Sequence, residues 1–134
     1  MTKGSLLLDA RSALESQIIT SFLEAADYQV ADFTTWRQAT DSRLTDFDAA
    51  VLVIENENTN LAETCVRVRE MTQRPHLPLV MVTAQPPAHT IEGLAVLIRP
   101  IRLFDLVYTL DQVIADSHRQ NPNGLQSRHT TIHV

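Results

Sequence analysis

Short apolar runs that alternate with amphipathic segments constrain the fold of this chain most. Segments 48–54, 78–84 and 96–100 are each dominated by Val, Leu, Ile, Ala or Met, and each ends near a small, polar or proline residue. Runs of this length and composition are typical of strands that are buried on both faces. Strands that alternate with helices predict a parallel sheet whose crossover helices cover both of its faces.

The amino-terminal part continues the same alternation. We expect a first strand at Leu6–Leu8 and a short second strand over residues 28–33. Between them, Leu14, Ile18 and Phe22 recur at four-residue spacing, with polar residues in between. This spacing predicts an amphipathic helix whose Leu14, Ile18 and Phe22 stripe faces the core.

Three further helices follow from the same kind of pattern. They are expected from Trp36 to about Leu44, over a segment that puts Leu61, Cys65, Val68 and Met71 on one face, and from Leu103 onward with Val107, Leu110 and Ile114. The polar segment 56–60 can supply a cap for the second of these helices. Cys65 is the only cysteine, and its place on the apolar face indicates a small buried hydrophobe.

Five strands with helices on both sides predict an α/β, flavodoxin-like, doubly wound sheet with strand order 2-1-3-4-5. In such sheets the ligand site lies at the carboxyl ends of the central strands. Asp9, Val53, Thr83 and Arg99 are therefore the positions that decide the chemistry. Periodicity stops near Ser117, so we expect one domain over residues 1–116 and a tail or linker over 117–134.

Composition excludes several classes of function. The chain has 134 residues, of which 44% are hydrophobic and 20% are charged, and its formal net charge is −5. An acidic chain lacks the clustered Lys and Arg that nucleic-acid binding requires. No apolar run approaches the roughly 20 residues needed to span a bilayer, and the amino terminus lacks a signal-peptide core. We therefore expect a cytoplasmic protein with no membrane or direct nucleic-acid contact.

Motifs for cofactors and metals are also missing. Only three glycines occur, too few for a dinucleotide-binding or phosphate-binding glycine loop. His129 and His133 have helical spacing but no third ligand beside them in the sequence. The sequence predicts neither a cofactor nor a metal site.

The ends of the expected strands carry a resemblance to a known family. Thr83-Ala84 ends the fourth strand and Arg99-Pro100 ends the fifth. This arrangement resembles the receiver (CheY-like) domain of bacterial response regulators over about residues 5–116. In that family the third strand ends in a phosphate-accepting aspartate, and a lysine stands where this chain has Arg99. The resemblance puts Val53 at the acceptor position, Asp9 at the first magnesium-binding acid and Ala10 at the second.

These departures imply that the receiver chemistry is lost. Valine has no lone pair with which to attack phosphorus, and Asp9 without a second carboxylate should bind Mg²⁺ poorly. The resemblance therefore implies a degenerate pocket formed by Asp9, Ala10, Val53, Thr83 and Arg99. We expect Arg99 to pair with Asp9 across this pocket, and the Thr83 hydroxyl to bond nearby backbone.

The segment between Thr83 and Arg99 is shorter than the resemblance implies, so the helix between the fourth and fifth strands should be shortened or missing. Val96 stands where a switching receiver usually has an aromatic residue. A missing helix should uncover apolar surface, which usually marks an interface. We expect a protein partner, or a second copy of the chain, to dock on Pro86–Leu106. The expected contact residues are Ile91, Leu94, Ile101, Leu103 and Phe104.

The resemblance and the departures together predict a pseudo-receiver. Such a domain is a non-enzymatic, phosphorylation-independent interaction or dimerisation module of a bacterial regulatory protein, joined to an output domain. Two alternatives stay open. One is a diverged phosphoaccepting receiver that uses Asp48 or Glu55, and the other is a sensor of a small ligand, such as a nucleotide, in the crevice at the strand ends.

Overall fold

The structure, a computed structural model, describes residues 2–38, 46–55 and 60–120. Five strands lie in these ranges: β1 Gly4–Asp9, β2 Tyr28–Asp32, β3 Ala49–Val53, β4 Leu79–Thr83 and β5 Leu94–Ile98. Four helices lie in the same ranges: α1 Ala13–Ala25, α2 Phe33–Gln38, α3 Leu61–Thr72 and α4 Leu103–Gln120. Every strand pairs in parallel with its neighbours, and the sheet order is β2-β1-β3-β4-β5. The predicted fold class is confirmed.

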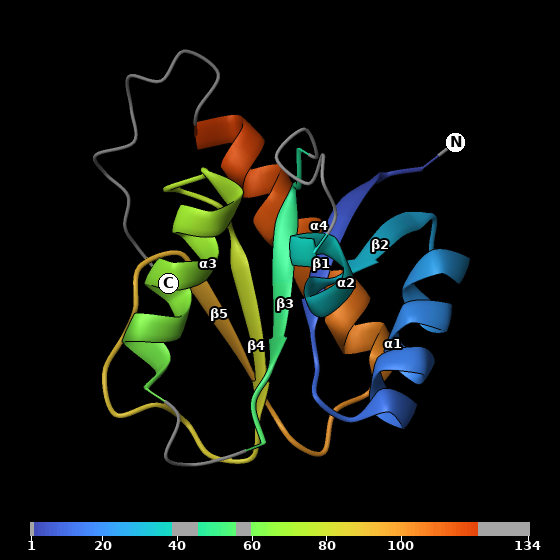
Figure 1. The fold of residues 1–134 in the computed structure, drawn as a ribbon, viewed down its shortest axis with the longest axis horizontal. Helices are drawn as coiled ribbons and strands as arrows, with labels where there is room; N and C mark the ends of the chain where they lie inside the picture. Colours follow the sequence, from blue (N-terminus) through green and yellow to red (C-terminus); the bar gives the residue numbers. More distant parts are fainter. Residues whose placement is uncertain (1, 39–45, 56–59, 121–134) are drawn as a thin grey trace.

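The sheet separates two hydrophobic core clusters. Figure 1 shows the helices that lie on either side of the sheet. On one face, α1 and α4 cover the sheet with Ile19, Leu23, Leu106 and Leu110. On the other face, side chains of α2 and α3 form the second cluster with the alternate residues of β1, β3 and β4. All residues of β3 and β4 are buried, which explains their continuous apolar runs.

The predicted core stripe of α1 is wrong. Ile19 and Leu23 are the buried residues of this helix, whereas the side chains of Leu14 and Ile18 are 67% and 50% exposed. The apolar residues of α1 cover an arc wider than the strip that contacts the sheet. Periodicity identifies such an arc but does not say which edge of it is buried, so the helix is rotated relative to the expectation.

The second helix begins earlier than predicted. Phe33, expected at the end of a strand, starts α2 and is buried with Trp36 beside Phe47. The Trp36 and Phe47 rings meet edge to face, which is a favourable aromatic geometry. The rest of the predicted helix, residues 39–44, lies outside the described ranges.

The third helix is capped as expected. The Asn60 side chain accepts a hydrogen bond from the Glu63 backbone N–H at 3.1 Å. Cys65 and Val68 are buried in the second core cluster, so the prediction of Cys65 as a core residue is confirmed. Burial raises the pKa of the Cys65 thiol, and the nearby Arg69 partly opposes this effect.

The connection between β4 and β5, residues 84–93, contains no helix, which confirms the predicted loss. Arg69 of α3 links this connection to the loop before β4, because it donates hydrogen bonds to the Glu92 carbonyl oxygen at 3.0 Å and to the Leu77 carbonyl oxygen at 3.1 Å. Gly93 has φ +75°, and a Cβ at this position would collide with the Arg69 guanidinium. At the other end of the domain, α4 continues through Gln120, beyond the predicted start of a tail at Ser117.

Candidate functional site

The parallel sheet brings the predicted site residues to one edge. Asp9, Val53 and Thr83 are the last residues of β1, β3 and β4, and Arg99 directly follows β5. Val53 lies level with Val82 in the β3–β4 register. The Arg99 backbone N–H donates a 2.8 Å hydrogen bond to the Thr83 carbonyl oxygen. The four positions therefore meet at the carboxyl edge, where doubly wound sheets bind their ligands.

Hydrocarbon fills the position at the end of β3. The Val53 side chain is 5% exposed and belongs to the same core cluster as Val82 and Leu106. Ala10, which follows β1, packs against that cluster. The centre of this edge is thus an extension of the hydrophobic core, and neither residue supplies an oxygen, nitrogen or sulfur atom that could act as a nucleophile or a metal ligand.

The expected pair between Asp9 and Arg99 is wrong, because the guanidinium of Arg99 binds Glu15 instead. Its two terminal nitrogens donate to the two Glu15 carboxylate oxygens at 2.7 and 3.1 Å. This hydrogen bonding raises the pKa of Arg99 above its ordinary value, and burial lowers it by a smaller amount. A bidentate pair of this kind fixes both the position and the orientation of the guanidinium.

Glu15 is a site residue that sequence reasoning missed. It lies in the first turn of α1, where its backbone N–H donates to the Ser12 hydroxyl at 3.2 Å. The N-cap therefore positions the carboxylate that holds Arg99. In the sequence, Glu15 is a polar residue between the apolar residues of a helix. Its role depends on the rotation of α1, which the sequence pattern did not determine.

Asp9 occupies half-buried surroundings at the end of β1. Burial is the main cause that raises the pKa of its carboxyl group, and the charges of Arg67 and Arg11 partly oppose it. Asp32, which ends the neighbouring strand β2, adds a smaller repulsion that acts in the same direction as burial. The ionised form of Asp9 is therefore disfavoured relative to an aspartate in water.

The Thr83 hydroxyl is engaged locally. Thr83 is 6% exposed, and its Oγ1 lies 3.1 Å from the Gln85 carbonyl oxygen, to which it donates. Thr83 Oγ1 also accepts a weaker hydrogen bond from the Gln85 backbone N–H at 3.4 Å. This arrangement confirms the expected bond to nearby backbone and closes the loop after β4.

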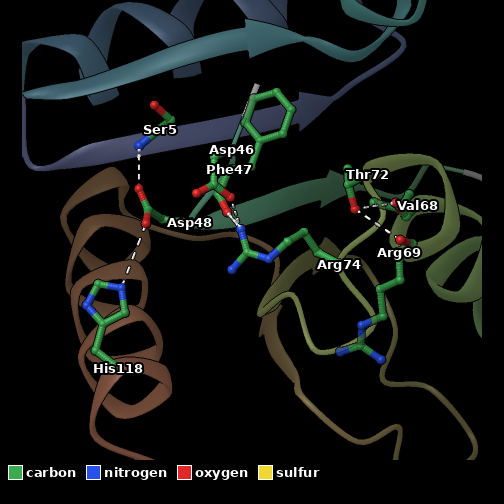
Figure 2. A network of polar contacts seen from close by, with 9 residues as sticks. All are labelled: Ser5, Asp46, Phe47, Asp48, Val68, Arg69, Thr72, Arg74 and His118. Carbon is green, nitrogen blue, oxygen red and sulfur yellow. Dashed lines mark hydrogen bonds and ion pairs between the residues drawn. The ribbon is translucent and has the colours of Figure 1, made fainter. Parts of the chain in front are cut away.

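The two carboxylates considered as alternative acceptors lie at different ends of the sheet. Glu55 is exposed beyond β3 at the carboxyl edge, and its charge contributes to the raised pKa of Arg99. Asp48 precedes β3 at the opposite edge. There its carboxylate accepts the Ser5 backbone N–H at 2.8 Å and lies 3.8 Å from His118 Nε2, as Figure 2 shows. The structure therefore does not bring Asp48 to Thr83 and Arg99.

No group of three or more His, Cys, Asp or Glu side chains with the geometry of a metal site occurs in residues 2–38, 46–55 and 60–120. His129 and His133 lie outside these ranges. Within the same ranges, none of the helices has the length and hydropathy of a membrane span.

The five expected interface residues are not equally accessible. Ile91 and Leu94 are half-buried against the second core cluster, and Ile101 and Leu103 against the first. Phe104 alone among them is strongly exposed, at 76%. Next to the helix-free connection lies a cavity of about 160 Å³, lined by Pro87, Ala88, His89, Thr90, Ile91, Leu94 and Val96.

Of three comparisons with known proteins, the one with solved structures finds similar folds. No family model matches the chain, and no curated protein matches it in sequence. Among solved structures, it is similar to a response regulator receiver protein from Sinorhizobium medicae, with a TM-score of 0.64, 18% identity and coverage of 83% of this chain and 94% of that one. It is also similar to the chemotaxis response regulator CheY4 of Vibrio cholerae, with a TM-score of 0.65, 22% identity and coverage of 84% and 99%.

A third similar structure is the signal receiver domain of a histidine kinase from Syntrophus aciditrophicus. Its TM-score is 0.65 at 15% identity, and the similarity covers 98% of each chain. The shared architecture extends over almost the whole of these receiver domains, while the sequences have diverged far. The chain therefore has the fold of a response regulator receiver domain.

Proposed function

We propose that this protein is a pseudo-receiver, a non-enzymatic protein-interaction module of a bacterial regulatory protein that works in the cytoplasm without phosphorylation. The observation that carries the proposal is Val53, which is buried in the core at the end of β3. A receiver-type reaction needs an acceptor oxygen at this point, and here the position is filled by hydrocarbon.

The basic residue at the end of β5 supports the same proposal. A free cation at this position could contact phosphoryl oxygens, but the guanidinium of Arg99 is held by both oxygens of Glu15. The Thr83 hydroxyl is bonded to the Gln85 backbone. The groups that could respond to a phosphoryl group thus have internal partners, which favours a domain with a single state.

The test is incubation with Mg²⁺ and acetyl phosphate, followed by intact-mass spectrometry. The protein should gain no phosphoryl mass. A stoichiometric gain of one phosphoryl group that peptide mapping assigns to Glu55 or Asp48 would instead support the diverged phosphoacceptor. Glu55 is the stronger of these two candidates because it lies at the same edge as Arg99.

The proposed docking surface for the protein partner or output domain is the segment Pro86–Leu106. Its support is the helix-free connection, the adjoining cavity and the 41% exposed Ile98 at the end of the edge strand β5. An edge strand with apolar side chains and unpaired backbone groups is a recurrent site of protein docking.

Hydrogen exchange in the native regulatory protein tests this surface. Ile98→Glu should leave the circular dichroism spectrum unchanged and should make residues 86–106 exchange faster than in the unsubstituted protein. Equal exchange in the two proteins would show that nothing docks on this segment.

A further inference from the structure

An exposed apolar surface lies on α1 and α4, and it includes Leu103 and Phe104 from the end of the segment Pro86–Leu106. Six large hydrophobic side chains are exposed in the described residues, and four of them belong to these two helices. They are Leu14 at 67% and Ile18 at 50% on α1, and Phe104 at 76% and Tyr108 at 66% on α4. Contiguous apolar surface of this kind usually marks an interface.

This surface combines a shallow groove with protruding rings. The groove runs along α1 and is lined by Gln17, Ile18, Ser21, Phe22, Ala25 and Leu103. The Phe104 ring stands beside it, edge to face with Phe22 at a centroid distance of 5.3 Å. A surface that carries both a groove and a ring can receive the ring of an identical surface and insert its own ring in return, which is the requirement of a two-fold interface.

The charges at the ends of α1 indicate which partner could dock on this surface. Arg11, which precedes the helix, and Glu24, near its end, are both exposed. The exposed positions between them, Ala13, Leu14, Gln17, Ile18 and Ser21, carry no formal charge. An antiparallel copy of α1 that crosses between Gln17 and Ile18 would bring each Arg11 to the same level along the helix axis as Glu24 of the other copy. The helix is thus charge-complementary to itself when it is reversed.

We infer that a second copy of this chain docks on this surface, with the two α1 helices antiparallel and the aromatic residues of α4 at the flanks. The neutral centre offers nothing to a strongly acidic or basic partner. The net charge of −5 opposes an anionic lipid surface. This inference does not rest on the proposed loss of phosphorylation. It uses Leu103 and Phe104 from the end of the segment Pro86–Leu106 and leaves residues 86–98 for a different protein.

Sedimentation velocity between micromolar and near-millimolar concentrations tests the inference. The protein should pass from monomer to dimer over this range. Ile18→Glu should abolish the dimer, and Leu14→Glu should do the same if the first variant folds poorly. The matched control is Val66→Glu, because Val66 is 54% exposed on α3, on the opposite face of the sheet, and its replacement should leave the dimer intact.

A charge swap tests the antiparallel geometry. Arg11→Glu alone should weaken the dimer by up to about tenfold, since it replaces attraction between two pairs of opposite charges with repulsion between like charges. The double variant Arg11→Glu/Glu24→Arg should recover most of that loss. A wild-type monomer at every concentration would overturn the inference, as would a swap without recovery or equal effects of Ile18→Glu and Val66→Glu. None of these outcomes affects the phosphorylation test.

Discussion

At the carboxyl edge of the sheet, a few side chains decide what the domain can do. Val53 extends the core to the carboxyl end of β3, and Glu15 holds the guanidinium of Arg99, which follows β5. Asp9 is the carboxylate that ends β1, and burial raises its pKa. Because of this burial, its negative charge is a cost to folding that the nearby arginines only partly offset.

Asp9→Asn should therefore raise the thermal unfolding temperature at pH 7. The folded-state pKa of Asp9 lies above its ordinary value of 3.8, so the folded state binds this proton more tightly than the unfolded state does. As the pH falls from above the folded-state pKa toward 3.8, the unsubstituted protein gains stability relative to the variant. The advantage of Asn should therefore shrink over this range. Circular dichroism melts from pH 7 to pH 4 measure both effects, with the exposed Asp116→Asn as the control.

A lower unfolding temperature for Asp9→Asn at pH 7 would mean that the ionised carboxylate has a stabilising contact, contrary to its raised pKa.

From the sequence, the positions Asp9, Val53, Thr83 and Arg99 were predictable because parallel strands align their carboxyl ends. The partner of Arg99 was not predictable, because it depends on how α1 is rotated about its axis.

Among the elements, the connection between β4 and β5 contains no helix, whereas each of the other three crossovers contains one. Arg69 links this connection to the loop before β4, because its guanidinium bonds the Glu92 and Leu77 carbonyl oxygens. Burial lowers the pKa of Arg69, with smaller opposing effects from Cys65 and Glu92. Gly93 allows the chain to pass the guanidinium closely in a left-handed conformation.

Gly93→Ala should lower the free energy of unfolding by about 1–2 kcal/mol from the left-handed backbone alone, and by more where its Cβ meets Arg69. Urea unfolding measures this loss. In an Arg69→Met background the collision disappears, so Gly93→Ala should cost less there. An equal cost in both backgrounds would contradict the role of Arg69 in holding this connection.

The missing helix was predictable from length alone, because the segment between two identified strand ends was too short for it. The position of α1 and the start of α2 were not. The apolar arc of α1 is wider than the strip that the sheet covers, so the exposed Leu14 and Ile18 could not be separated from the buried Ile19 and Leu23 by periodicity. Phe33 has high propensity for strands, but packing beside Trp36 places it in a helix.

At the scale of the whole molecule, the chain has the fold of a receiver domain, and Val53 at the end of the third strand belongs to the core. The fold was predictable because alternating buried strands and amphipathic helices allow few arrangements. Two apolar surfaces remain outside the core, one beside β5 and one across α1 and α4. Residues 86–98 share no residue with the surface across α1 and α4, which would allow one domain to bind a regulatory partner and a second copy at the same time.

The most direct test of the central claim compares the unsubstituted protein with Val53→Asp and Ala10→Asp/Val53→Asp in Mg²⁺ and acetyl phosphate, with intact mass as the readout. The account predicts no phosphoryl gain in the unsubstituted protein, less than full labelling of Val53→Asp, and the highest labelling of the double variant if it folds. Stoichiometric phosphorylation of the unsubstituted protein would contradict the account, whichever carboxylate carries the phosphoryl group.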